Sequence, residues 1–394
     1  MVADGERDRP ASPDAPTSPA GAPIRVMHVF GVMDRGGAEM RTVELMRGMR
    51  PGRFVQEFCS LEGKDGVLDA EIRALGGEVH ACPMGLGFPA RFLALIRARR
   101  IDIVHSHVHL ASGVLVALAA AGGVRRRIAH FRSTADDRGN GVGRRAYRRT
   151  MHALIDRFAT DIVGCGEGAI AFGWSPRWAD DPRCQVIHNG IAVERFEAPV
   201  DRAGVRAELG LAADTPLAIH VARFAHPKNQ TRIVEVFAAA ARRGPGHLLF
   251  VGRGDNPEEA AVRTRVAACG LGDRVHFLGL RSDIPRLLGA SDVALLTSWF
   301  EGMPGAVLEA VAAGTPVVAN DLPGVLEIVR ALPGVVVRSL DDSDDRWGED
   351  IARALATPPT AAARTAAHAR FRASHFSLPT AIARTEALWA KARP

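Results

Sequence analysis

Short apolar runs that alternate with helical stretches constrain the fold more than any other feature of this sequence. In the first half the runs are Ile24 to Phe30, Phe54 to Leu61, Glu78 to Cys82, Ile101 to Val104, Arg127 to Phe131 and Asp161 to Cys165. The run at 24–30 alternates poorly between apolar and polar residues, as expected of a strand buried on both faces. Strands that alternate with helices predict a parallel sheet with helices on both faces.

The pattern starts again after a turn and linker at 186–199. The later runs are Pro216 to Ala222, His247 to Val251, Arg274 to Leu278, Asp292 to Thr297, Pro316 to Ala319 and Gly334 to Val337. We therefore predict an α/β chain of two Rossmann-like, doubly wound parallel-sheet domains that face each other across a cleft; 394 residues suffice for two full cores. We expect a disordered tail at 1–22, domains at 23–195 and 196–378, and a last helix within 379–394.

Charge and cysteine content narrow the class of protein. The net charge of +6 is dispersed, apart from clusters at Arg125–Arg127 and Arg144–Arg149, so it suits anionic nucleotides or a membrane surface and does not indicate nucleic-acid binding. Five cysteines without Cys-x-x-Cys spacing indicate reduced thiols in a cytoplasmic protein. No apolar run reaches the roughly 18 residues of a membrane span.

The stretch from Ser298 to Ala310 combines a strand end, a glycine-bearing loop and a helix start. The unpaired amides of a helix start attract phosphate. The loop and helix start contain Gly302, Met303, Pro304 and Gly305. Glu301 and Glu309 stand in the same pocket and suit hydroxyl groups, so the stretch predicts a ligand with both a diphosphate and sugars.

Two further glycine turns and one histidine cluster are candidates for binding. Gly36 and Gly37 follow the first strand and either cradle a phosphate or simply turn the chain. Gly252 follows a later strand, without the third glycine of a dinucleotide fingerprint. His105, His107 and His109 would share one face of an extended chain, but no fourth ligand accompanies them, so we expect no metal site. We interpret the acids at 341–345 as a helix cap.

Glu301 and Glu309, eight positions apart around Gly-Met-Pro-Gly and followed by Ala-Gly-Thr-Pro-Val-Val, resemble the donor-site motif of the GT-B retaining glycosyltransferases of family 4. The resemblance covers residues 24 to 392. It implies that Glu301 holds hydroxyls of the donor sugar and that Glu309 holds the ribose. It also implies that the last helix returns to the first domain.

The same resemblance assigns further roles. Gly36 and Gly37 match the family's glycine loop, and His107 matches its histidine at the donor–acceptor junction. Arg223 and Lys228 match the cations that hold the donor diphosphate, where they would stabilise the charge of the leaving group. Arg281 lies in the loop that typically meets the base. The catalytic set is then His107, Glu301, Arg223 and Lys228.

The predicted reaction moves a hexosyl or aminohexosyl group from a nucleotide sugar, most simply UDP-linked, to an acceptor hydroxyl with retention. We expect neither a cofactor nor a metal. Retention by double displacement needs a carboxylate nucleophile, and both acids of the motif are assigned to hydroxyls. We therefore expect a front-side mechanism in which the leaving diphosphate takes the acceptor proton.

The acceptor is predicted from one polar loop that contains Arg132, Asp136 and Asp137. Paired acids there favour an amine-bearing small acceptor, such as an aminocyclitol of an aminoglycoside antibiotic pathway. The alternative is a lipid-linked sugar in polysaccharide assembly. The basic helix at Arg144–Arg149 would suit weak membrane contact, but the simpler interpretation of this charge run, which we favour, is a solvated helix face. Other classes that remain open are a nucleotide-sugar epimerase or hydrolase and an idle binding partner; a nicotinamide oxidoreductase is disfavoured because the fingerprint is lacking.

Overall fold

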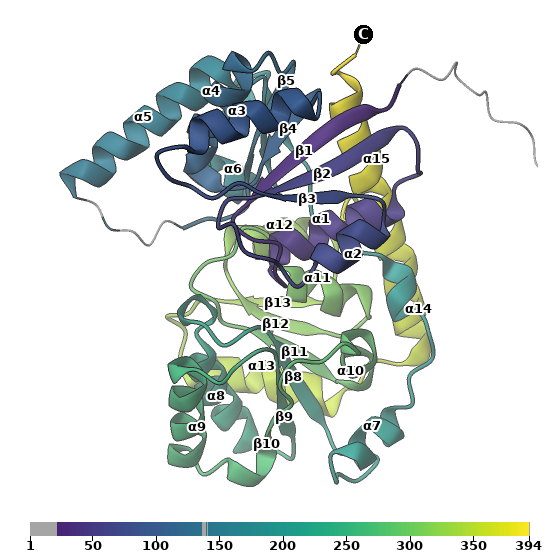
Figure 1. The fold of residues 1–394 in the computed structure, drawn as a ribbon. Helices are drawn as coiled ribbons and strands as arrows, with labels where there is room; N and C mark the ends of the chain where they lie inside the picture. Colours follow the sequence, from purple (N-terminus) through teal and green to yellow (C-terminus); the bar gives the residue numbers. More distant parts are fainter. Residues whose placement is uncertain (1–21, 136–138, 140, 394) are drawn as a thin grey trace, which may run out of the picture.

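The computed structural model describes residues 22–135, 139 and 141–393, which form two parallel sheets placed one above the other (Figure 1). The predicted α/β fold with two doubly wound domains is confirmed. Of the tail predicted to be disordered, residues 1–21 lie outside the described part of the chain, as do Asp136 and Asp137.

The first sheet has seven strands in the order β3-β2-β1-β4-β5-β6-β7. The strands are β1 (Ile24–Phe30), β2 (Phe54–Ser60), β3 (Glu78–Ala81), β4 (Ile103–Ser106), β5 (Arg126–Phe131), β6 (Asp161–Gly164) and β7 (Cys184–Val186). The helices are α1 (Gly37–Gly48), α2 (Asp69–Ala74), α3 (Phe88–Ala98), α4 (Ser112–Ala121), α5 (Val142–Phe158) and α6 (Glu167–Gly173). Val26, Met27 and Val29 are fully buried, which explains why β1 does not alternate.

The second sheet has six strands in the order β10-β9-β8-β11-β12-β13. The strands are β8 (Leu217–Val221), β9 (His247–Val251), β10 (Val275–Phe277), β11 (Val293–Leu296), β12 (Val317–Asn320) and β13 (Val335–Arg338). The helices up to the last strand are α7 (Arg202–Glu208), α8 (Gln230–Ala241), α9 (Pro257–Ala268), α10 (Ile284–Ala290), α11 (Gly305–Ala312) and α12 (Pro323–Ala331).

The acid-rich segment before α13 (Asp344–Ala356) differs in detail from the predicted helix cap. Ser343 occupies the N-cap position and makes no side-chain capping bond, while Asp344 and Asp345 lie in the first turn. Asp344 forms an ion pair with Arg232, and Asp345 contacts Arg243 at 3.1 Å. The segment therefore ties α13 to α8, and its acids favour the helix dipole without capping the helix.

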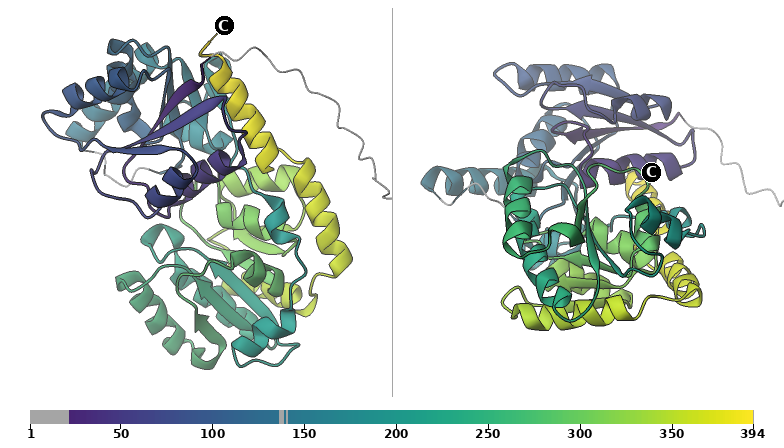
Figure 2. Two further views of the ribbon diagram at one scale, coloured as in Figure 1. Left: turned by 45° about the vertical axis from the view of Figure 1, so that its right-hand side comes forward. Right: turned by 90° about the horizontal axis from the view of Figure 1, so that it is seen from below.

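The chain returns to the first domain through α14 (Ala361–Ala373) and α15 (Leu378–Ala390), drawn in yellow in Figure 2. Leu388 and Trp389 of α15 share a buried cluster with Ile24 and Val26 of β1. At the junction of the two helices, the amide of Ile191 donates to the carbonyl of Phe376 at 2.9 Å. Two chain crossings thus connect the domains. No helix among the described residues is long and apolar enough to cross a membrane.

Candidate active site

The strand order reverses once in each sheet, between β1 and β4 and between β8 and β11. Ligands of open parallel sheets bind beyond the carboxyl ends of the strands at such a point. The loops that follow these four strands contain Gly36, Gly37, His107, Arg223, Lys228 and Glu301. The fold therefore brings predicted site residues from both domains to the two reversal points.

The loop between β11 and α11 lies directly against the first domain. A Cβ atom on Gly302 would lie only 2.2 Å from the carbonyl oxygen of Arg132. The hydroxyl of Thr134 donates to the carbonyl oxygen of Glu301 at 2.9 Å. Because no larger residue fits, Gly302 is required for the approach of the two domains. The sequence predicts this glycine only as part of a phosphate-binding loop, so its role in the domain contact is visible only in the structure.

The start of α11 offers free backbone donors. Pro304 is the N-cap residue, and its carbonyl accepts from the amides of Val307 and Leu308 at 3.1 and 3.2 Å. The amides of Gly305 and Ala306 come before these first helical bonds, so they are not used within the helix. Together with the helix dipole, such amides favour an anion.

Charged side chains from both domains surround this helix start. Lys228, in a short 3₁₀ turn after β8, pairs with Glu301 at 2.5 Å, and the hydroxyl of Ser298 donates to the same carboxylate at 3.0 Å. Burial raises the pKa of Glu39 in α1, and the charges of Arg132 and Arg223 oppose that shift without cancelling it. Arg223 is therefore close enough to the first domain for its charge to act across the cleft.

Glu309 pairs with Arg41, a residue that the sequence analysis did not identify. Arg41 lies on α1 of the opposite domain and also pairs with Glu44. Burial by itself would lower the pKa of Arg41, but Glu309 and Glu44 outweigh that effect and raise it. The guanidinium therefore stays charged in a site that is nearly closed to solvent. The only signal in the sequence was its place on the helix that follows the glycine pair.

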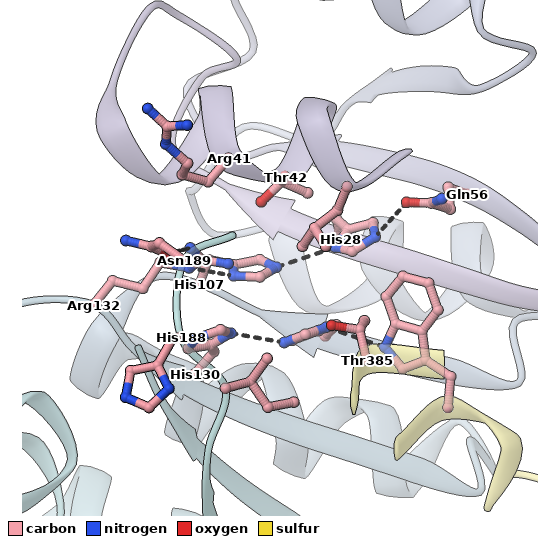
Figure 3. Close-up of a pocket in the computed structure, with 14 residues that line it drawn as sticks. His28, Arg41, Thr42, Gln56, His107, His130, Arg132, His188, Asn189 and Thr385 are labelled. Atoms are coloured by element: carbon pink, nitrogen blue, oxygen red, sulfur yellow. Dashed lines mark hydrogen bonds between the residues drawn. The ribbon is translucent and has the colours of Figure 1, made fainter. Parts of the chain in front are cut away.

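Five histidines are among the residues that line a cavity of about 20 Å³ in the first domain, drawn in close-up in Figure 3. That volume holds about one water molecule, so it excludes a sugar. Four of them, His28, His105, His107 and His130, stack against one another, and the fifth is His188. Burial lowers the pKa of His28 to about 3 and holds the pKa values of the other three stacked histidines well below their usual range. All four stacked rings are neutral at pH 7.

Arg132 fixes the tautomer of His107. Its Nε donates to Nδ1 of His107 at 3.0 Å, and a guanidinium can only donate. The proton of the neutral His107 ring is therefore on Nε2, which donates to Nδ1 of His28 at 3.1 Å. His28 in turn donates from Nε2 to Gln56 at 3.2 Å. Both ring nitrogens of His107 are thus engaged by protein groups.

Trp389 of α15 fixes the second pair in the same way. Its indole N–H donates to Nδ1 of His105 at 3.3 Å, so the His105 proton lies on Nε2 and is donated to His130 at 3.0 Å. His130 accepts this hydrogen bond through Nδ1, so the single N–H of its neutral ring is on Nε2. The described residues supply no hydrogen-bond partner for that Nε2.

These tautomers argue against a metal at the histidines. The nitrogens of His28, His105 and His107 lie within 4.8 Å of one another, but a metal-bound imidazole donates its other N–H to an acceptor. Arg132 and Trp389 offer donors instead. The face predicted for an extended run of His105, His107 and His109 does not form, because His109 has a φ of 52° and begins a 3₁₀ turn.

The structure also shows the surroundings of the other residues that were predicted to bind the donor or the acceptor. A Cβ atom on Gly252 would lie 2.0 Å from the carbonyl oxygen of Ala222, so this residue makes a tight turn next to Arg223. A Cβ atom on Gly37 would meet nothing within 4 Å. Arg281 bonds to Asp283 and lowers the pKa of that acid to about 2. Of the three predicted acceptor residues, Arg132 falls among the described residues, whereas Asp136 and Asp137 lie outside them.

A fold with two such domains and this site defines the class of GT-B glycosyltransferases. Residues 201–370 match the family model for glycosyl transferases group 1, and residues 36–190 match that for the glycosyl transferase 4-like domain. The putative glycosyltransferase EpsF of Bacillus subtilis (strain 168) is 32% identical over 341 residues, which cover 84% of this chain and 88% of the relative. The chain belongs to the group 1 glycosyl transferases.

Two other relatives match this chain over different shares of its length. The capsular polysaccharide biosynthesis glycosyltransferase CapH of Staphylococcus aureus is 29% identical over 73% of this chain and 78% of its own. The 2-deoxystreptamine glucosyltransferase of Streptomyces kanamyceticus is 32% identical over 48% of this chain and 47% of its own. Among solved structures, Anabaena HepE in complex with UDP and glucose shares the fold, with a TM-score of 0.77, 20% identity and coverage of 93% of this chain and 100% of that one.

Acidification should destabilise the protein through its neutral histidines. An unfolded histidine takes up a proton near pH 6.5, whereas His28 in the folded state has a pKa of about 3. Between these two pH values the unfolded state binds more protons than the folded state. The free energy of unfolding therefore decreases as the pH is lowered, by up to about 1.4 kcal/mol per pH unit for each such histidine. The free energy of unfolding, measured by urea denaturation between pH 7 and pH 4, should change less steeply with pH in His28→Gln than in the wild type. Equal dependence on pH in the two proteins would mean that His28 takes up its proton in the folded state as well.

Gly302→Ala should force the domains apart, because its Cβ would collide with backbone that cannot turn away. Small-angle X-ray scattering should give a larger radius of gyration than for the wild type. Gly305→Ala is the matched control for this measurement, since its Cβ has no neighbour closer than Arg41 Nη2 at 3.9 Å. The same radius for both variants would show that the contact at Gly302 does not set the domain spacing.

Proposed function

We propose that the protein moves a hexosyl or aminohexosyl group from a UDP-sugar to an acceptor hydroxyl with retention. The observation that carries the proposal is the grouping of Lys228, Glu301 and Glu309 around the start of α11. A cation and unpaired amides suit a diphosphate, and carboxylates suit hydroxyl groups. The UDP bound by HepE, which has the same fold, supports the choice of nucleotide.

In this proposal Arg223 and Lys228 stabilise the diphosphate as it leaves. Negative charge grows on that group as the bond to the anomeric carbon breaks, so fixed cations lower the barrier. Glu301 binds hydroxyls of the sugar and Glu309 binds the ribose. Because cations and helix-start amides already offset the diphosphate charge, the reaction as proposed needs no resident metal or cofactor.

Retention is proposed to occur from the front side. The acceptor oxygen bonds to the anomeric carbon on the face from which the diphosphate departs, and the acceptor proton passes to the departing oxygen. The contacts of Glu301 with Lys228 and of Glu309 with Arg41 support a binding role for these acids. A third acid, Glu39, folds back over Gly36: a Cβ atom built on Gly36 would lie 2.1 Å from the carboxylate of Glu39.

His107 is proposed to shape the reacting cleft and to contact the sugar without exchanging a proton. Its Nδ1 accepts from Arg132, and its Nε2 carries a hydrogen that is donated to His28. Neither nitrogen is free to accept the acceptor proton. This arrangement supports the diphosphate as the proton acceptor.

For the acceptor we favour a sugar carried on a lipid in polysaccharide assembly. CapH, named for capsular polysaccharide biosynthesis, matches most of this chain, whereas the 2-deoxystreptamine glucosyltransferase matches less than half. The exposed Arg145 and Arg149 of α5 suit weak contact with an anionic membrane surface. An aminocyclitol acceptor, predicted from the sequence, is the second candidate.

We also propose that the protein works in the cytoplasm, because its five cysteines are free and reduced thiols are typical of that compartment.

A panel of UDP-sugars tested against lipid-linked sugars and aminocyclitols, in EDTA, examines this proposal. We expect transfer to a lipid-linked sugar with an unchanged anomeric configuration. Transfer only to an aminocyclitol would replace the favoured acceptor, and dependence on added metal would contradict the metal-free reaction. Conversion of the UDP-sugar in the absence of any acceptor would indicate an epimerase or hydrolase.

Glu301→Ala should reduce kcat by about 100-fold or more while UDP affinity stays within about threefold, since the sugar but not the nucleotide loses a ligand. Loss of Glu301 also leaves Lys228 unpaired and available to the diphosphate. Steady-state kinetics and calorimetry with UDP measure the two effects. Equal losses of turnover and UDP affinity would mean that the role of Glu301 is misassigned.

A further inference from the structure

We propose that Arg41 binds the diphosphate of the donor from the N-terminal domain and so completes the donor site when the cleft is closed. The inference rests on the proposed function, because it assumes that the diphosphate lies at the start of α11. It adds a cation that is supplied across the cleft, whereas Arg223 and Lys228 both belong to the C-terminal domain.

The guanidinium of Arg41 is held at one end and projects at the other. Nη1 pairs with Glu44 on the same helix, and Glu44 is itself held by Arg195 at 2.7 Å. Nη2 reaches across the cleft to Oε1 of Glu309. The anchored end limits rotation of the side chain, so little conformational entropy remains to be lost when Nη2 binds a ligand.

The projecting nitrogen lies over the proposed diphosphate site. A Cβ atom built on Gly305 would be 3.9 Å from Arg41 Nη2, which places a guanidinium N–H beside the first residue of α11. Free amides and an arginine then converge on the same space. Arginine suits this position because its planar donors bind phosphate oxygens in pairs.

Stability alone does not account for this arrangement. The side chains of Arg41 and Glu309 are 10% and 16% exposed, and ion pairs of this kind lose most of their attraction to the cost of desolvation. The pair uses one oxygen of Glu309, which leaves the other for ribose hydroxyls. Arg41 can therefore hold the Glu309 carboxylate in place and contact the nucleotide beside it.

The test measures UDP affinity by calorimetry for Arg41→Gln, with Arg195→Gln as the matched control. Arg195 contacts the same Glu44 but does not reach Glu309 in the structure. We expect Arg41→Gln to weaken UDP binding by about tenfold or more, as for a lost charged hydrogen bond, and Arg195→Gln to change it by less than about twofold. Arg41→Lys, which keeps the charge, should recover part of the loss and covers the case in which Arg41→Gln fails to fold.

Glu309→Gln separates a diphosphate contact from a purely structural one. If Arg41 only supports Glu309, Arg41→Gln will have no further effect on UDP affinity in the Glu309→Gln background; if it binds the diphosphate, most of its effect will remain. Lys228→Ala tests the donor site itself. Loss of affinity in Lys228→Ala but not in Arg41→Gln would overturn the role of Arg41 alone, and unchanged affinity in both would overturn the proposed donor site as well.

Discussion

The contact between the loop after β11 and the carboxyl edge of the first sheet decides the geometry of the cleft. Gly302 brings the backbone of this loop against Arg132, and Thr134 bonds to Glu301. A second contact supports the first: Glu327 of α12 accepts from the amide of Glu167 at 2.9 Å. Apolar side chains add to these contacts: Cys165 and Ala169 of the first domain share a buried cluster with Met303 and Val325 of the second.

Charge is arranged so that each acid near α11 faces a cation. Lys228 faces Glu301 within one domain, while Arg41 faces Glu309 across two. Such pairs contribute little to stability because the cost of desolvation offsets much of their attraction, but they keep charged groups aligned in a closed site. A ligand with a diphosphate and hydroxyl groups matches both halves of this arrangement, which is the physical basis of the proposed donor site.

The histidine network shows how a polar core can be rigid and uncharged. Arg132 and Trp389 can only donate, and this single fact fixes the tautomers of two histidine pairs. Trp389 belongs to the last helix, so the C-terminal segment helps to order the histidine network of the first domain. His107 is thereby held in one orientation and one protonation state.

The sequence by itself determined the fold class, because buried parallel strands require continuous apolar runs and glycine marks their turns. It also indicated Glu301, Glu309, Arg223 and Lys228, whose motifs are short and continuous in the chain. Only the tertiary structure could show Arg41 beside Glu309 or His28 beside His107, since these partners are 268 and 79 positions apart. No local pattern encodes such pairs: they arise where strands and helices from distant parts of the chain meet, and burial there sets their protonation.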